Sequence, residues 1–163
     1  MKTLYVARHA TAEPHSPTGE DFDRRLALRG EAEITGVASR ARDLYLGLDL
    51  IIASPAARTL ATAGAYARAF GMDEDRFQTA KTIYTTDTGH LAEFVQALPE
   101  SADRILLVGH NPVISRLARW LADSDDFPEF VPATVAVYAI DAERWAHVDP
   151  TLSRLIARIA PER

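Results

Sequence analysis

Short hydrophobic runs bounded by polar residues recur along this chain, and each run is shorter than a typical helix. Continuous apolar runs of about four to eight residues are typical of strands that a sheet buries on both faces. A weaker pattern at residues 76–79 indicates a short strand or an extended link. The runs that predict strands occupy residues 3–7, 50–53, 105–108 and 135–140.

Between these runs, apolar residues recur at helical spacing. Ser54 and Pro55 suit the N-cap and the first position of one predicted helix, and Gly71 suits its end. Pro99 stops another. The predicted helices cover residues 26–45, 55–70, 91–98 and 112–121. The predicted loops cover residues 11–25, 82–89 and 123–128.

The alternation of short strands and helices predicts an α/β domain with a mostly parallel sheet. Near the C-terminus, residues 144–148 are predicted as a hairpin partner for the strand at 135–140. Residues 151–159 are predicted as a weak helix or a loosely attached tail. The chain shows no internal repeat and no domain boundary, so residues 1–163 are expected to form a single domain.

Polar residues that can carry chemistry follow three of the predicted strands. Arg8 and His9 follow the first strand. Arg58 lies shortly after the second, and His110 lies just after the third. Ligands of parallel sheets bind outside the carboxyl ends of the strands, which meet at one edge. We therefore expect these four side chains to converge there.

Two arginines and two histidines at one sheet edge suit phosphate chemistry. Arginine presents a planar fork of donors that matches phosphate oxygens, and helix N-termini add backbone N–H groups. One histidine can attack phosphorus and carry the phosphoryl group covalently, while a second donates hydrogen bonds to its oxygens. Fixed donors of this kind stabilise the charge of a phosphoryl-transfer transition state. The sequence therefore favours a phosphoryl-transfer site.

Composition narrows the possible functions. The 163 residues are 47% hydrophobic and carry a net charge of −5, which argues against a general nucleic-acid binder. The absence of cysteine excludes disulfides, thiolate catalysis and cysteine-ligated zinc. With no signal peptide and no run long enough to span a bilayer, no membrane partner and a cytoplasmic location are expected. A metal-dependent hydrolase built on His9 and His110 is disfavoured, because Arg8 would repel the cation.

Three motifs in order carry a family resemblance. They are Arg8-His9-Ala10, Ser54-Pro55-Ala56-Ala57-Arg58 and Gly109-His110-Asn111-Pro112. In type, order and spacing these motifs resemble those of the histidine phosphatase superfamily, which includes the phosphoglycerate mutases. The resemblance is strongest to the small bacterial phosphohistidine phosphatases of the SixA type. It extends from residue 2 to about residue 141.

The resemblance implies a fold and a role for each motif residue. The fold would be a phosphoglycerate mutase-like three-layer α/β/α sandwich with a mostly parallel central sheet. His9 would be the nucleophile that becomes phosphorylated. Arg8, Arg58 and His110 would complete the phosphate pocket. Neither a metal nor an organic cofactor would be needed.

This chain departs from the family pattern before the first long helix. Family members often read Arg-Pro-Leu-Thr there, whereas this chain has Arg24 followed by Arg25, Leu26 and Ala27. The usual threonine cap is therefore missing. Arg24 is expected at the rim of the site, as is Asn111, whose simpler interpretation is a turn residue. Ser54 is interpreted as a helix cap rather than a ligand.

A general acid is harder to assign. Larger family members supply one, usually a glutamate, from an insertion. This chain has about fifty residues between Arg58 and His110, too few for a sizeable lid. The candidates for a proton donor are Asp87, Glu13 and Asp21.

The missing acid favours one class of substrate. An alkoxide leaving group needs protonation by a positioned acid, whereas the imidazole of phosphohistidine can be protonated beforehand. The sequence therefore predicts a phosphatase that acts on a phosphohistidine-bearing phosphotransfer protein and releases inorganic phosphate. The alternatives are a small-molecule phosphomonoesterase of the same superfamily and a non-catalytic phosphate-binding module. A mutase is disfavoured without a lid.

Overall fold

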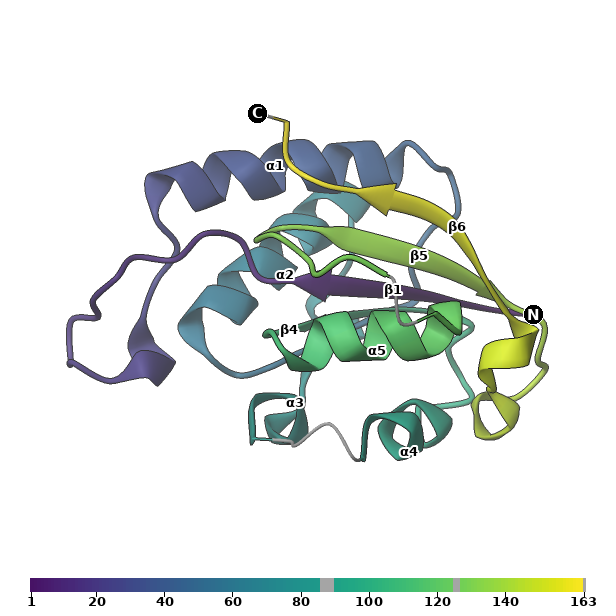
Figure 1. Ribbon diagram of the computed structural model, residues 1–163. Helices are drawn as coiled ribbons and strands as arrows, with labels where there is room; N and C mark the ends of the chain where they lie inside the picture. The colour runs from purple at the N-terminus through teal and green to yellow at the C-terminus, as the bar shows by residue number, and fades with distance from the viewer. Residues whose placement is uncertain (86–89, 125–126, 163) are drawn as a thin grey trace.

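The computed structural model describes residues 1–85, 90–124 and 127–162. Within them, a six-stranded sheet forms the centre of the molecule, with helices on both of its faces (Figure 1). The strand order is β3-β2-β4-β1-β5-β6. The strands are β1 (Lys2–Arg8), β2 (Leu50–Ala53), β3 (Phe77–Thr79), β4 (Arg104–Gly109), β5 (Val135–Ile140) and β6 (Ser153–Ile159).

The predicted parallel sheet is confirmed for the first four strands. β1 pairs in parallel with β4, β4 with β2, and β2 with β3. β5 runs antiparallel to β1, and β6 antiparallel to β5. Residues 4–7 of β1 are all 0% exposed, which explains why this strand has a continuous apolar sequence.

Helices cover the two faces and complete the predicted three-layer α/β/α sandwich. Side chains alternate across β1: Tyr5 packs with the cluster beneath α1 and α2, and Leu4 with the cluster beneath α4 and α5. No helix in the described ranges has the length and apolarity needed to cross a membrane. The helices are α1 (Leu28–Arg42), α2 (Ala57–Phe70), α3 (Lys81–Thr85), α4 (Leu91–Gln96) and α5 (Val113–Ala122).

The C-terminal prediction was wrong. Trp145–His147 forms a 3-10 turn, and the strand that pairs with β5 on the side away from β1 is β6, in the segment predicted as a weak helix or tail. Leu155 and Ile156 remain 38% and 37% exposed, and Arg154 and Arg158 interrupt the apolar residues. Hydrogen bonding to β5, rather than a period of burial, makes this segment a strand, so periodicity could not reveal it.

Two local predictions also need correction. α2 begins at Ala57 rather than Pro55, and no side-chain hydrogen bond caps its start at Ala56 within the described chain. Ser54 is instead engaged by the site described below. The segment 82–89 was predicted as a loop, but α3 continues to Thr85. The remainder of that segment, 86–89, lies outside the described residues.

The loop that follows β1 is closed at its base. Ala12 and Leu26 form an antiparallel bridge, and the Ala27 amide donates to the Thr11 carbonyl at 3.0 Å. A Cβ atom at Gly30, on the first turn of α1, would lie 2.0 Å from that same carbonyl oxygen. Only glycine therefore allows α1 to approach the chain so closely after the end of β1.

Candidate active site

The carboxyl ends of β1, β2 and β4 lie side by side, because these strands are parallel neighbours. Arg8, the last residue of β1, is in register with Gly109, the last residue of β4. His9 and His110 follow directly, and their ring centroids are 5.4 Å apart. The first turn of α2 adds Arg58. The structure thus brings the four residues named from the sequence to one edge.

One ring nitrogen of His9, Nδ1, is held by a backbone carbonyl. His9 is 8% exposed, and its Nδ1 lies 2.7 Å from the carbonyl oxygen of Ala10. A carbonyl oxygen only accepts, so Nδ1 carries the hydrogen and Nε2 keeps its lone pair. Burial lowers the pKa of His9 to about 4, and the charges of Arg58 and Arg8 add to this effect. At neutral pH the ring is therefore uncharged, as a nucleophile requires.

His110 is held by Ser54. Its Nε2 lies 2.7 Å from the Ser54 hydroxyl oxygen, which also accepts from the Ala56 amide at 3.4 Å. The hydroxyl hydrogen is then free to donate to Nε2, an arrangement that assigns the ring hydrogen to Nδ1. Burial lowers the pKa of His110 to about 3, with contributions from Arg58 and His9. The Ser54 hydroxyl therefore fixes the Nε2 edge of this ring, and when it donates to Nε2 the ring hydrogen lies on Nδ1.

Arg8 is anchored by the chain that precedes β5. Its Nη1 donates to the carbonyl oxygen of Phe130 at 2.7 Å, and the Asn111 side-chain amide donates to the same oxygen at 3.0 Å. The other end of that amide accepts two hydrogen bonds from Ser115. Asn111 was expected at the rim, but these contacts make it a support for the carbonyl that holds Arg8.

Arg58 is 5% exposed and faces Asp21, in the first loop. Its Nη1 donates to the Asp21 carbonyl oxygen at 2.8 Å and its Nη2 to the Asp21 carboxylate at 2.9 Å. These two contacts use two of the five N–H groups of the guanidinium. Three N–H groups remain for another acceptor.

Three buried nitrogens near the two histidines lack a partner among the described residues. They are Nε of Arg8, Nε of Arg58 and Nδ1 of His110. A buried donor without an acceptor costs about 1–3 kcal/mol, so such a group calls for an explanation. Phosphate oxygens are acceptors that suit N–H groups of this kind. Within the described ranges, no group of three or more histidine or acidic side chains is placed to hold a metal ion.

A second set of side chains forms the outer rim. Asp21 accepts from Arg24 Nε at 3.0 Å and from the Tyr84 hydroxyl at 3.2 Å, in addition to Arg58. The Tyr84 ring packs edge-on against His110, with centroids 5.3 Å apart, and Phe22 packs edge-on against Tyr84 at 5.3 Å. Arg24, which was expected at the rim, thus contacts Asp21 in this outer set.

The three proton-donor candidates fare differently. Burial alone would raise the pKa of Asp21, but hydrogen bonds from Arg58 and Arg24 hold it below its usual range. The Glu13 side chain is exposed in the first loop, where its backbone carbonyl accepts from Arg24. Asp87 lies outside the described residues. Of the described pair, only Asp21 lies against the pocket, and there it is ionised.

Sequence reasoning missed Phe22, Tyr84 and the link between Ser54 and His110. Tyr84 and Phe22 lie in segments without hydrophobic periodicity, so no pattern distinguished them from solvated loop residues. The serine is different, because it follows a strand end directly. Its position beside the carboxyl end of β4 was a usable signal.

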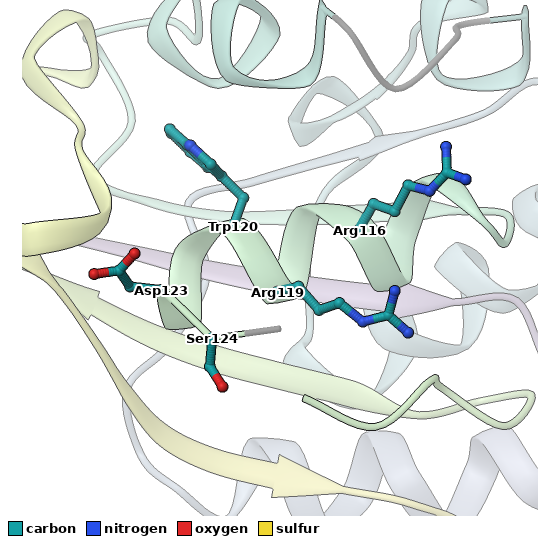
Figure 2. Close-up of a pocket in the computed structure, with 5 residues that line it drawn as sticks. All are labelled: Arg116, Arg119, Trp120, Asp123 and Ser124. Carbon is teal, nitrogen blue, oxygen red and sulfur yellow. The ribbon is translucent and has the colours of Figure 1, made fainter. Parts of the chain in front are cut away.

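A separate hollow of about 440 Å³ lies along α5 from Arg116 onward and the turn after it (Figure 2). It contains none of the strand-end residues. Its lining consists of Arg116, Arg119, Trp120, Asp123 and Ser124.

Two bacterial proteins are similar to this chain in sequence, although no family model matches it. An uncharacterised protein of Picosynechococcus sp. is 32% identical over 126 residues, which are 73% of this chain and 72% of the relative. An uncharacterised protein of Mycobacterium tuberculosis is 30% identical over 158 residues, 86% of this chain and 91% of the relative.

Solved structures give the more specific relation. A protein of Agrobacterium tumefaciens assigned as the phosphohistidine phosphatase SixA is 30% identical, with a TM-score of 0.81 and 99% of both chains covered. A SixA assigned in Nakamurella multipartitia is 25% identical, with a TM-score of 0.83 over 99% of this chain and 97% of that one. The resemblance inferred from the three motifs is confirmed. The chain therefore belongs to the histidine phosphatase superfamily, as an enzyme of its SixA type.

Proposed function

We propose that this enzyme removes phosphoryl groups from phosphohistidine side chains of phosphotransfer proteins, through a covalent intermediate on His9. The observation that carries the proposal is the set of three buried, unpartnered nitrogens beside a neutral histidine. Phosphoryl oxygens supply acceptors for these three nitrogens of Arg8, Arg58 and His110. The Nε2 lone pair of His9 supplies the nucleophile.

In the first step, His9 Nε2 attacks phosphorus and forms a P–N bond. The P–N bond to the substrate imidazole breaks, and its electron pair returns to the leaving ring nitrogen. A ring protonated on its other nitrogen leaves as neutral imidazole, so no proton has to be delivered during the step. The Ala10 carbonyl, 2.7 Å from Nδ1 of His9, stabilises the positive charge that develops on this ring.

The negative charge of the transferred phosphoryl group needs more stabilisation than the leaving imidazole does. The three phosphoryl oxygens keep their negative charge throughout a loose phosphoryl transfer, so fixed donors supply most of the stabilisation. Arg8 and Arg58 provide the positive countercharge, and each is fixed by a backbone carbonyl. Nδ1–H of His110, set by Ser54, adds a neutral donor.

In the second step, water attacks phosphorus and the P–N bond to His9 breaks. Inorganic phosphate leaves, and the water proton that is not retained by phosphate passes to solvent. His9 returns to its neutral tautomer with Nδ1–H on the Ala10 carbonyl. The cycle uses one water and regenerates every protein group.

The choice of phosphohistidine rests on the state of the rim acid. A poor leaving group such as an alkoxide needs a proton, and Asp21 is ionised at neutral pH because Arg58 and Arg24 lower its pKa. Glu13 points its backbone rather than its side chain into this network. A leaving group that is already protonated avoids this difficulty.

Trapping tests the proposal. The enzyme is incubated with a ³²P-phosphohistidine protein, quenched at alkaline pH and mapped by peptide. We expect label on His9, no label in His9→Ala, and unchanged labelling in His15→Ala, because His15 is exposed in the first loop. Label on another residue would refute the intermediate. Efficient hydrolysis of small phosphate esters with intact phosphohistidine would refute the substrate class.

A further inference from the structure

We propose that Asp21 is a specificity-determining residue that accepts a hydrogen bond from the N–H of the leaving imidazole, and so favours phosphohistidine over other phosphoryl donors. This inference rests on the function proposed above. It deepens that function by assigning the leaving-group side of the pocket, which the family motifs leave without a residue.

The position of Asp21 follows from burial. His9 and Arg58 are 8% and 5% exposed, whereas the Asp21 side chain is 56% exposed. In-line displacement places the leaving group opposite the nucleophile, which means toward solvent when the nucleophile is buried. Asp21 contacts Arg58 directly and is the more exposed of the two side chains. It therefore lies on the solvent side of Arg58.

Asp21 is also held too firmly to be a passive surface residue. Its carboxylate accepts from Arg24, Arg58 and Tyr84, which come from the first loop, α2 and α3. Those three bonds leave acceptor capacity on the carboxylate, which has about four lone-pair sites. The held carboxylate is therefore available to one further donor from the solvent side.

The leaving group matches that acceptor. A phosphohistidine ring protonated on its remote nitrogen presents an N–H, and it carries a positive charge that a carboxylate stabilises. The proton stays on the ring: the P–N electron pair returns to the ring, and neutral imidazole departs with the N–H that Asp21 accepted. An aryl phosphate offers no such donor, and its leaving phenolate is repelled by the carboxylate.

The aromatic rings of Tyr84 and Phe22 lie beside the Asp21 carboxylate. Tyr84 packs against His110 and Phe22 packs against Tyr84, so a flat ring entering beside Asp21 meets aromatic surface. The charged and titratable groups that face this space are Arg24 from the first loop, Arg58 from α2, Tyr84 from α3 and His110 after β4, with Glu20 beside Tyr84.

The test compares two substrates at two pH values. The kcat/KM is measured with a phosphohistidine peptide and with para-nitrophenyl phosphate, for the wild type and Asp21→Asn. At about pH 8.5, where a free imidazole is neutral, we expect Asp21→Asn to lose about tenfold on phosphohistidine. At about pH 6 the loss should shrink, because the ring is protonated without help. Hydrolysis of the aryl phosphate should become faster.

Two further variants guard the interpretation. Asp23→Asn is the matched control, since Asp23 lies on the same turn but accepts from Thr18 instead. Tyr84→Phe removes one of the bonds that hold Asp21 and should give a smaller loss with the same pH dependence. An equal loss on both substrates at both pH values would overturn the proposal, and so would a gain on both, which would make Asp21 a block on Arg58.

Failure of this inference is distinguishable from failure of the proposed function. Wild type and Asp21→Asn are both labelled from the phosphohistidine protein. Label on His9 in both proteins, with an unchanged ratio of the two kcat/KM values, would overturn the role of Asp21 alone. Absence of label on His9 in the wild type would overturn the covalent mechanism itself.

Discussion

The inner pocket and the outer rim of this site are built in different ways. The pocket residues sit on strand ends or the first turn of a helix; His9 and Arg58 are buried, and Arg8 and His110 are half-buried. The rim residues sit in the first loop and in α3. Phe22, in the first loop, is 39% exposed. Sheet register and backbone carbonyls position most of the pocket, with Ser54 and the Asp21 carboxylate as side-chain contacts, whereas contacts between side chains predominate at the rim.

This difference divides the chemistry from the choice of substrate. In the proposed mechanism, the pocket groups meet the transferred phosphoryl group, which every substrate shares. The rim groups would meet the leaving group, which differs between substrates. Pocket variants should therefore change the rate with all substrates alike, whereas rim variants should change their ratio.

The largest effect is expected from Arg58→Ala. It removes charge from the transferred oxygens, so kcat/KM should fall about 10²- to 10³-fold with phosphohistidine and with an aryl phosphate alike. Steady-state kinetics on both substrates measure this, with Arg68→Ala as the control, because Arg68 is exposed near the end of the same helix. A loss confined to phosphohistidine would break the division between pocket and rim.

A smaller effect is expected from Ser54→Ala. Without the hydroxyl, Nε2 of His110 loses its donor and the ring no longer favours the Nδ1–H tautomer. We expect about a tenfold loss of kcat on both substrates. The ¹⁵N chemical shifts of the His110 ring report the tautomer directly. Unchanged shifts together with full activity would show that Ser54 does not position this ring.

The smallest effect is a dependence of the free energy of unfolding on pH, which arises from the two pocket histidines. Both pocket histidines have lowered pKa values when folded, about 4 and about 3, so the unfolded chain binds more protons as the pH falls below 6.5. The free energy of unfolding should drop by about 1 kcal/mol per histidine between about pH 6.5 and 5.5. Urea titrations measure it.

A variant and a ligand check the source of that dependence. His110→Asn should remove about half of it, since one of the two titrating rings is gone. Saturating inorganic phosphate should also weaken it, because a bound anion favours the protonated rings. A pH dependence that neither change alters would arise elsewhere in the chain.

The sequence predicted the pocket because buried strands and the polar residues after them are a local pattern. β2 and β5 were placed at the residues where the structure has them, and the register of β1 with β4 then brings His9 and His110 together. The rim was not predictable in this way. Asp21 and Tyr84 are 63 positions apart and meet only through tertiary contacts, for which neither segment carries a period.

β6 escaped prediction for a related reason. Its apolar residues stay partly exposed, so the pairing with β5 rather than an internal pattern defines the strand. The start of α2 was misplaced because Ser54 resembles a helix cap in sequence, while its hydroxyl is used by His110. Both errors come from partners that lie far away along the chain.

The bridge between Ala12 and Leu26 makes the loop between them an exchangeable unit. The contact of Thr11 with Ala27 and the close approach at Gly30 fix both ends of the loop, whatever residues it contains. A loop transplanted between these anchors would carry a new rim while leaving the nucleophile in place. Recognition in this scaffold can thus diversify by replacement of one loop, provided that the new loop supplies the carbonyl oxygen that Asp21 gives to Arg58.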